Sequence, residues 1–467
     1  MNGVVRVPMD VFRLRHVVAA AAGAAALWIA VARPFDLGVS QANSAALIVA
    51  VLALWATAII PEILTSLLFF LLAMLLVVAP AEVVFSGFHS AANWTVFGGL
   101  VIGAAVQTTG LGARIANAFA RRFTFGYAGV IAGMVTVGVV LAFLMPSSMG
   151  RIVLLAPIAM ALAERLGFRP GSNGYLGVVL AMGFGTSSPA AGILPANVPN
   201  LVLMGGAESV YGVVLTYGPY LLLHFPTLGV LKALVIVGAI VVMFPDRPTF
   251  SDQGTTDAPA SADEKRLGLF LVLALLAWMT DFAHQVSPAW IALAAALACM
   301  LPVIGVLPRT IFAGNINFVP IFLTAAILGV GALVDHVGLG EIIGRELHAA
   351  VAFEPGHDVM TFAAVILIDT VVQFLITAPG IAAVMVPLSG SIAEASGLPV
   401  ATVLNMHAVG YSNYLLPYQM GPLLIVGAVC NVPNAQLTRT CLAVGLTGLL
   451  VLTPVSYLWW RFLGYLN

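Results

Sequence analysis

Two stretches decide the fold of this chain: FLMPSSMGRIVLLAPIAMALAERLG, Phe143 to Gly167, and FLITAPGIAAVMVPLSGSIAEASG, Phe374 to Gly397. Four landmarks of the first recur in the second, each 230 positions later, as Gly380, Pro387, Glu394 and Gly397. Each copy has an apolar arm, a break rich in Pro, Gly, Ser or Thr, and a second apolar arm that ends at a charge. The pattern predicts two helical hairpins, at 126–166 and 360–395, whose polar tips stop inside a lipid bilayer.

A polar tip at that depth indicates a binding site. Hydrocarbon offers no partner to the N–H and C=O groups of broken backbone, so irregular backbone survives there only where it is buried in protein or lines a wet cavity. Paired broken segments in two halves of a chain are the best sequence pointer to the binding site of a transporter.

Composition places the chain in a membrane. Of its 467 residues 61% are hydrophobic and 8% are charged, and the mean hydropathy is +1.07, whereas about a quarter of the residues of a soluble domain are charged. The net charge of −1 and the absence of a Lys/Arg run exclude a nucleic-acid partner. Three scattered cysteines suggest neither a disulfide framework nor a metal site, and no sequence signature of an enzyme or of a nucleotide site is present.

The apolar runs predict an all-α polytopic protein with about eleven transmembrane helices plus the two re-entrant hairpins. The expected spans lie near 17–32, 43–60, 63–79, 94–109, 174–206, 219–243, 267–283, 288–304, 318–334, 401–428 and 441–463. We divide the chain into an N-terminal segment with the first span (1–40), a first repeat (41–245), a polar cytoplasmic linker (246–266) and a second repeat (267–467).

Lys and Arg residues set the expected orientation. With a cytoplasmic N-terminus, thirteen of the eighteen fall on the cytoplasmic side and three outside, as the positive-inside rule requires. The Ala-rich run after Arg13 and Arg15 also resembles a signal peptide, but it serves equally as a first helix. Five crossings separate equivalent points of the two copies, which makes the repeats inverted.

The tips and the later breaks supply the polar groups of the expected site. Helix arms that begin at the tips point N–H groups at whatever lies between them, which favours an anionic substrate. The breaks at 185–200 and 411–422 place Thr, Ser, Asn, Tyr and Gln side chains near the midplane. Individually these side chains also suit a plainer role, in which they satisfy freed backbone.

Six charged or polar residues lie in otherwise apolar runs, and Gln373 is one of them. Arg151 follows the first tip, and an arginine at membrane depth usually has a functional partner. It could bind the substrate anion, take the place of a metal ion, snorkel to the cytoplasm or pair with Glu164. Lys232 has no assigned role, and His224, His407 and Asp369 could relay protons.

At these residues the chain resembles the divalent-anion/sodium symporter family, within the wider ion-transporter superfamily. That family has an S-N-T tripeptide at each tip and a T-P-P-N-like break in the following span. Here Ser147, Ser148 and Met149 stand at the first tip, and Thr377, Ala378 and Pro379 at the second. Asn197 to Asn200 resemble the first break motif, and Met420 to Leu423 stand at the second.

The resemblance implies an elevator-type homodimer that carries succinate, malate, citrate or sulfate. It implies a substrate site drawn from both tips and both breaks: Ser147, Ser148, Met149, Arg151, Asn197, Pro199, Asn200, Thr377, Ala378, Pro379, Tyr418, Gln419 and Pro422. It implies coupling-ion ligands from Ser147, Thr186, Ser187, Thr377 and Asn413. Both tripeptides lack the Asn of the family, so one sodium site is expected to be lost.

The sequence therefore predicts a secondary transporter of small divalent anions in the cell membrane. Sodium symport, sodium-independent exchange and proton coupling all stay open, and no other cofactor is expected. The alternatives are a cation/proton antiporter or metalloid-oxyanion efflux permease of the same superfamily, and a membrane scaffold or intramembrane enzyme.

Overall fold

The computed structural model describes most of the chain and is all-helical there. It describes residues 9–57, 59–112, 114–115, 126–249, 259–284, 286–311, 316, 318–339, 342, 353–374 and 376–466. Helices and short connections make up these residues, with no strand among them, which confirms the all-α prediction. Residues 250–258, in the middle of the linker, lie outside the described residues.

The first hairpin forms as the sequence predicts. Helix α8 (Gly126–Leu144) and helix α9 (Ser148–Arg165) are joined by a tip at 145–147. Ser147 is the N-cap of α9, and its Oγ accepts a hydrogen bond from the Gly150 N–H at 3.1 Å. A serine in this position satisfies one of the free N–H groups of a helix start. The polar tip residues thus begin the second arm.

The second hairpin differs from the first in its second arm. Helix α19 (Asp358–Val372) leads to the tip, and the returning arm is divided into α20 (Ala378–Met385) and α21 (Ser389–Ser396), which are bent by 60°. Pro387 lies at the bend, whereas Pro157 lies inside an unbroken α9. The difference follows from a partner: the Tyr211 hydroxyl donates to the Pro387 carbonyl at 2.7 Å and accepts from the Gly390 N–H at 2.9 Å.

Both broken spans are present. The first consists of α10 (Asn173–Ser187), two single turns η2 (Pro189–Gly192) and η3 (Leu194–Ala196), and α11 (Val198–Tyr211). The second consists of α22 (Val400–Tyr411), the turn η5 (Pro417–Gln419) and α23 (Gly421–Val429). The Pro and Gly residues of each break therefore interrupt the helix where the sequence predicted.

Each broken span is followed by a long helix with a π-helical middle. The first runs through α12 (Tyr217–His224), η4 (Phe225–Leu231) and α13 (Lys232–Met243). The second runs through α24 (Asn434–Thr447), η6 (Gly448–Leu452) and α25 (Thr453–Phe462). The two π segments contact each other. Such segments are frequent at functional sites, and the sequence analysis did not predict them.

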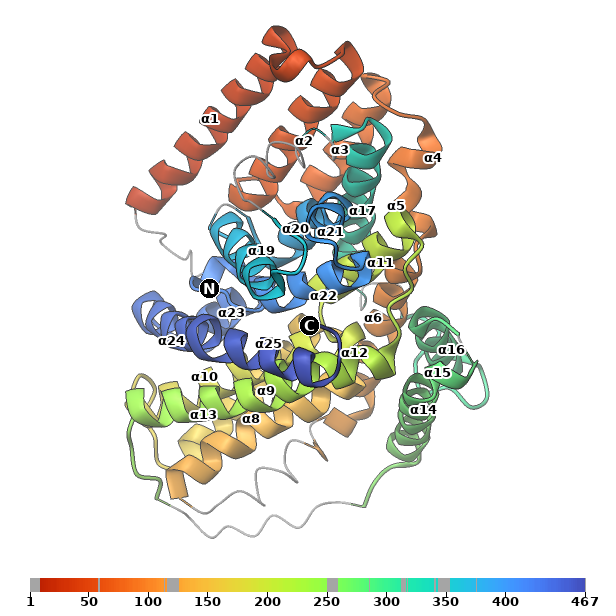
Figure 1. Cartoon of the computed structure of the whole chain (residues 1–467). Coiled ribbons are helices and arrows are strands. Elements are labelled where there is room, and N and C mark those ends of the chain that lie inside the picture. The colour runs from red at the N-terminus through yellow and green to blue at the C-terminus, as the bar shows by residue number, and fades with distance from the viewer. Residues whose placement is uncertain are drawn as a thin grey trace.

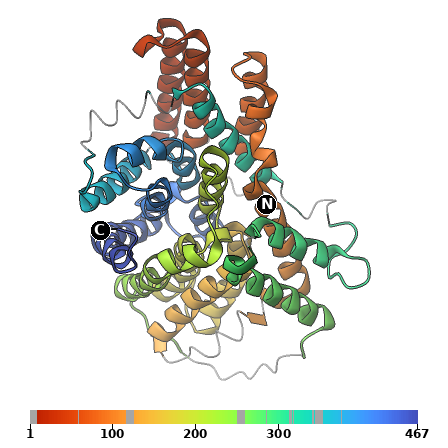
Figure 2. The same ribbon diagram turned by 45° about the vertical axis from the view of Figure 1, so that its right-hand side comes forward.

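The remaining helices lie around this centre. They are α1 (Met9–Ala32), α2 (Val39–Thr57), α3 (Glu62–Leu75), the short α4 (Ala81–Val84) and α5 (Ser86–His89), α6 (Ala91–Thr109), α14 (Ala262–Met279), α15 (Asp281–His284), α16 (Pro288–Met300) and α17 (Val319–His336). Figure 1 shows α1 to α3 at one end, and in Figure 2 α14 and α16 again lie away from the centre. Many of their large apolar side chains are exposed, as in a protein that faces lipid.

The two halves are interleaved. Helix α9 of the first hairpin packs against α23 of the second broken span, and α20 of the second hairpin packs against α11 of the first broken span. Each hairpin is thus held by the other half of the chain. Three described helices are long and apolar enough to cross a membrane, at 126–144, 217–243 and 434–462. The count of eleven crossings and the re-entrant placement of the tips stay predictions.

Close packing of α8 on α10 gives a test of the fold. A Cβ added at Gly138 would lie 2.7 Å from backbone atoms of Gly185 and Thr186. We expect Gly138→Ala to lower the free energy of unfolding by about 1–3 kcal/mol, measured as a lower thermal unfolding midpoint in detergent. The matched control is Gly238→Ala on α13, where a Cβ meets nothing within 4 Å. An unchanged midpoint for Gly138→Ala would contradict the α8–α10 contact.

Candidate functional site

Arg151 lies at the centre of the first tip. Its side chain is fully buried. One terminal nitrogen, Nη1, donates to the carbonyls of Met145 and Ala196, the latter at 3.0 Å. The other, Nη2, donates to Ser148 Oγ and to the Thr186 carbonyl, both at 2.9 Å. One guanidinium therefore joins the tip, the end of α10 and the turn η3.

These contacts decide between the predictions made for Arg151. Every hydrogen-bond acceptor around the guanidinium is a neutral oxygen, and Glu164 is an exposed residue at the far end of α9. Pairing with Glu164 and snorkelling to the cytoplasm were therefore wrong. Backbone carbonyls and hydroxyls are the ligands that hard cations prefer in proteins. The guanidinium occupies a place suited to a bound cation.

Asn200 holds the first break together. Its Nδ2 lies within hydrogen-bond distance of three carbonyl oxygens, those of Ala190, Ala191 and Ile193, at 3.3, 3.2 and 2.8 Å. Its Oδ1 accepts from the Tyr411 hydroxyl at 2.8 Å. A single amide thus adds a donor to carbonyls of one break, each of which also accepts from another group, and connects that break to the end of α22.

The neighbours of Asn200 also support the backbone. Asn197 caps α11, because its Oδ1 accepts from the Asn200 N–H at 3.0 Å, and Pro199 is buried beside it. The sequence analysis placed Asn197 and Asn200 in the substrate site. Their hydrogen bonds are to backbone groups and to Tyr411, as in the plainer role, and their place in the substrate site stays a prediction.

The second tip is held by glutamines instead of an arginine. Gln373 Nε2 donates to the Tyr411 carbonyl at 3.0 Å, and Gln419 Nε2 donates to the Gln373 carbonyl at 2.7 Å. Gln419 Oε1 accepts from the N–H groups of Leu415 and Leu416 at 2.6 and 2.7 Å. These contacts join the second tip to the second break without a charge.

The other predicted residues of the second half lie around the same contacts. Tyr418 donates its hydroxyl to the Phe374 carbonyl at 2.6 Å. Thr377 stands at the N-cap of α20 without a side-chain hydrogen bond to the helix. Ala378 is buried, whereas Pro379 and Pro422 are partly exposed. At the first tip, Ser147 is partly exposed and Met149 is 42% exposed.

Lys232 fills the second break. Its ammonium group donates to the Ser412 carbonyl, to Ser412 Oγ at 3.3 Å and to Asn413 Oδ1 at 3.1 Å. The side chain is fully buried at the start of α13. Asn413, predicted as an ion ligand, therefore contacts an amino group. Arg151 and Lys232 each bind the carbonyl at the point where a broken span is interrupted.

Several buried polar atoms of the site retain free hydrogen-bonding capacity. Within the described part of the chain, Thr186 Oγ1, Ser187 Oγ, Arg151 Nε and Gln373 Oε1 have no hydrogen-bond partner. Unsatisfied buried polar groups are rare and need an explanation, of which an unoccupied ligand site is one. Thr186 and Ser187 were predicted ion ligands. No group of His, Cys, Asp and Glu suited to a metal occurs among the residues that the structure describes.

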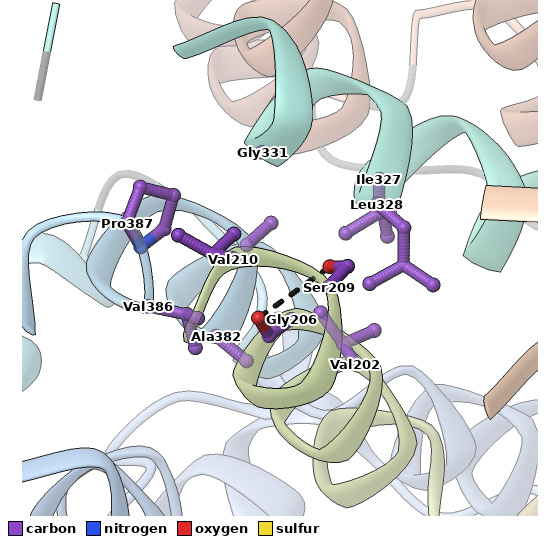
Figure 3. A pocket seen from close by; sticks show the side chains of 11 residues that line it. Val202, Gly206, Ser209, Val210, Ile327, Leu328, Gly331, Ala382, Val386 and Pro387 are labelled. Atoms are coloured by element: carbon purple, nitrogen blue, oxygen red, sulfur yellow. Dashed lines mark hydrogen bonds between the residues drawn. The ribbon is translucent and has the colours of Figure 1, made fainter. Parts of the chain in front are cut away.

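A small pocket lies away from these atoms. Figure 3 shows Val386 and Pro387 on one side of it and Ile327 and Leu328 of α17 on the other, with Val202 and Gly206 of α11 between. Its lining is mostly apolar, and it has room for about one water molecule. It contains none of the predicted site residues and does not suit an anion.

Comparisons with known proteins place the chain among transporters. A family model described as "Sodium:sulfate symporter transmembrane region" matches residues 15–466. The L-tartrate/succinate antiporter of Escherichia coli K12 is 24% identical over 397 residues, which cover 80% of this chain and 79% of the relative. Inner membrane protein YbhI of the same organism is 26% identical over 346 residues, 71% of each chain.

A solved structure supports the fold. The YdaH transporter of Alcanivorax borkumensis aligns with a TM-score of 0.55 at 15% identity, covering 81% of this chain and 86% of that one. The matched family and the named antiporters are transporters, which confirms that the chain is not an enzyme.

The role of Asn200 can be tested by exchanging its donor for an acceptor. Asn200→Asp keeps the shape of the side chain but places oxygen opposite the three carbonyls. The new carboxylate oxygen is buried without a donor, which costs about 1–3 kcal/mol or more, so we expect a clear loss of thermal stability in detergent. The matched control is Asn173→Asp, because Asn173 is exposed and contacts one carbonyl, that of Pro245, at 3.4 Å. Equal midpoints for the two variants would contradict the bracing role.

Proposed function

The chain belongs to the family described by the sodium:sulfate symporter transmembrane region, and from that premise we propose that it exchanges small divalent anions across the membrane without sodium. Dicarboxylates such as succinate, malate or tartrate are the proposed substrates, with citrate and sulfate as further members of the class. The relative named an L-tartrate/succinate antiporter, which matches over most of the chain, supports exchange. The relative named an inner membrane protein supports the location in the inner membrane.

The guanidinium of Arg151 carries this proposal. A sodium symporter needs oxygen atoms that are free to receive the ion, and the carbonyls of Met145, Thr186 and Ala196 already accept from Arg151. The positive charge is then part of the protein and cannot be released with the substrate. A carrier of this kind returns only when another anion is bound, which is exchange.

Lys232 supports the same proposal at the second break. Its ammonium takes the oxygens of Ser412 and Asn413, so Asn413 is not free to receive an ion. Two basic side chains, Arg151 and Lys232, thus lie at the two breaks that the proposed site of a divalent anion draws on. Ser147 and Thr377 are partly exposed at the N-termini of α9 and α20. The backbone N–H groups of these helix starts are the proposed donors to the substrate carboxylates.

The finer architecture belongs to the proposal as well. It comprises eleven crossings, two inverted repeats, re-entrant hairpins that move as an elevator, a homodimer, and an N-terminus on the cytoplasmic side of the inner membrane. The interleaving of each hairpin with the opposite half supports a single moving body.

The alternative, a cation/proton antiporter, is favoured by one observation, the buried carboxylate of Asp369.

Proteoliposomes test the proposed exchange. We expect uptake of labelled succinate or L-tartrate to require an unlabelled dicarboxylate inside, and to be equal in sodium and in choline buffers. Uptake into empty vesicles that depends on a sodium gradient would contradict exchange and favour symport. Absence of any dicarboxylate, citrate or sulfate uptake would contradict the transport function itself.

Arg151 variants test the part played by the fixed charge. We expect Arg151→Gln to reduce exchange by at least about tenfold, because the loss of a positive charge at the site costs more than about 1.4 kcal/mol of binding. Partial rescue by sodium is expected, since the carbonyls are then free to accept an ion. Arg169→Gln, at an exposed position, is the matched control and should leave exchange unchanged. Full exchange by Arg151→Gln would overturn this role.

A further inference from the structure

Asp369, His407 and Ser389 form a buried polar cluster that the proposed anion site does not use. His407 Nδ1 lies 3.1 and 2.9 Å from the two carboxylate oxygens of Asp369. His407 Nε2 lies 3.1 Å from Ser389 Oγ. All three side chains are fully buried. They come from α19, α22 and α21, so the cluster joins both arms of the second hairpin to the second broken span.

The surroundings of the carboxylate are shaped for it. A Cβ at Gly410 would lie 2.1 Å from Asp369 Oδ2, so only glycine leaves room for the carboxylate against α22. Within the described part of the chain, the Asp369 oxygens form hydrogen bonds only with His407. A buried carboxylate needs a partner that compensates its charge. Here that partner is itself titratable.

The packed elements carry three further carboxylates, Asp358 at the start of α19, Glu394 on α21 and Glu208 on α11. Their other titratable groups include Tyr411 on α22, Tyr211 on α11, Tyr220 and His224 on α12 and Tyr457 on α25. His224 Nε2 lies 3.0 Å from Asn405 Oδ1 and has no carboxylate partner. No lysine or arginine contacts the cluster within the described part of the chain. The charge of the cluster is therefore set by its own protons.

The Ser389 hydroxyl has one hydrogen and two possible acceptors. Its oxygen lies 3.2 Å from the Met385 carbonyl, to which it donates, and 3.1 Å from His407 Nε2. When His407 carries protons on both nitrogens, Nδ1 donates to Asp369 and Nε2 donates to Ser389, which leaves the Ser389 hydrogen for Met385. When His407 is neutral with its proton on Nδ1, the Ser389 hydroxyl donates to Nε2, and the Met385 carbonyl keeps only the hydrogen bond from the Leu388 N–H, at 3.1 Å.

This alternative connects the proton to the shape of the hairpin. Met385 is the last residue of α20 and Ser389 the first of α21, so the hydrogen bond between them spans the 60° bend. The small pocket of Figure 3 adjoins the same bend at Val386 and Pro387. Protonation of His407 closes a bond across the bend, and loss of the proton opens it.

We propose that Asp369, His407 and Ser389 form a proton-binding site of this transporter, and that the bound proton is a coupling ion carried with the second hairpin. One proton binds the His407–Asp369 pair and takes its net charge from −1 to 0. A neutral pair crosses low-dielectric surroundings at a lower cost than a charged one. Proton binding therefore favours movement of the hairpin.

The first experiment does not need a substrate, so it is independent of the proposed exchange. Infrared difference spectra of the full chain in lipid vesicles are recorded between about pH 6 and about pH 8, where histidine titrates. We expect carboxylate and imidazole bands that are lost in Asp369→Asn and in His407→Gln. The matched control is His224→Gln, since His224 is also fully buried, and this variant should retain them. Spectra of folded Asp369→Asn that equal those of the wild type would overturn the proton site.

The second experiment rests on the proposed exchange. Exchange of labelled L-tartrate, whose carboxyl groups stay ionised over this range, is measured with equal pH on both sides. We expect the wild-type rate to change by roughly tenfold between about pH 6 and about pH 8, and the rate of Asp369→Asn by less than about twofold. A wild type that exchanges tartrate at a rate independent of pH would overturn the coupling role and leave the exchange function intact.

Ser389→Ala provides a further test of the pH dependence of exchange, which can be measured even if Asp369→Asn and His407→Gln do not fold. It retains the His407–Asp369 pair and removes the hydroxyl that connects it to the bend. Since Ser389 acts as a positioning residue, we expect a shifted midpoint of the pH profile and not a lost one. The control is Ser396→Ala on the same helix, whose hydroxyl donates within α21 and accepts from the Leu398 N–H just after it, at 3.4 Å. An identical profile for Ser389→Ala and the wild type would overturn the link between the proton and the bend.

Discussion

Broken backbone in an apolar surrounding must be satisfied, and this requirement governs the structure. Two hairpin tips and two interrupted spans leave carbonyl and amide groups without helical partners. The chain meets the requirement with its own long polar side chains, above all Arg151, Asn200, Gln373, Gln419 and Lys232. The interruptions are therefore rigid and defined, which a binding site requires.

The same contacts connect the four interruptions into one network. Arg151 joins the first tip to the first break, and Asn200 joins that break to Tyr411 at the second. Gln373 then joins Tyr411 to the second tip. Displacement of one interruption would break hydrogen bonds at the next, so the tips and breaks are constrained to move together. Such a body suits a carrier that moves its site as a unit.

The architecture could be predicted because Pro, Gly and polar residues in apolar runs mark interruptions wherever they occur. Both hairpins and both broken spans follow from that local signal. The acceptors of Arg151 and Lys232 could not be predicted, because they lie up to 180 positions away in the chain. The bend at Pro387 depends on Tyr211 of another helix, so Pro157, the same residue in the other copy, gave no indication of it.

The buried charge of Arg151 affects the stability of the protein when its site is empty. A buried guanidinium without a carboxylate keeps its net charge, and the surrounding carbonyl dipoles compensate it only in part. Under the proposed function an anionic substrate supplies the missing compensation, and the empty site is then the less stable state of the protein. A carrier whose empty site keeps an uncompensated charge moves that site across the membrane slowly. A carrier that binds mobile cations can release them with the substrate and then return with an uncharged empty site. Exchange is thus the mode of transport that a covalently attached cation favours, and a proton on His407 and Asp369 can adjust the charge of the moving body without changing that preference.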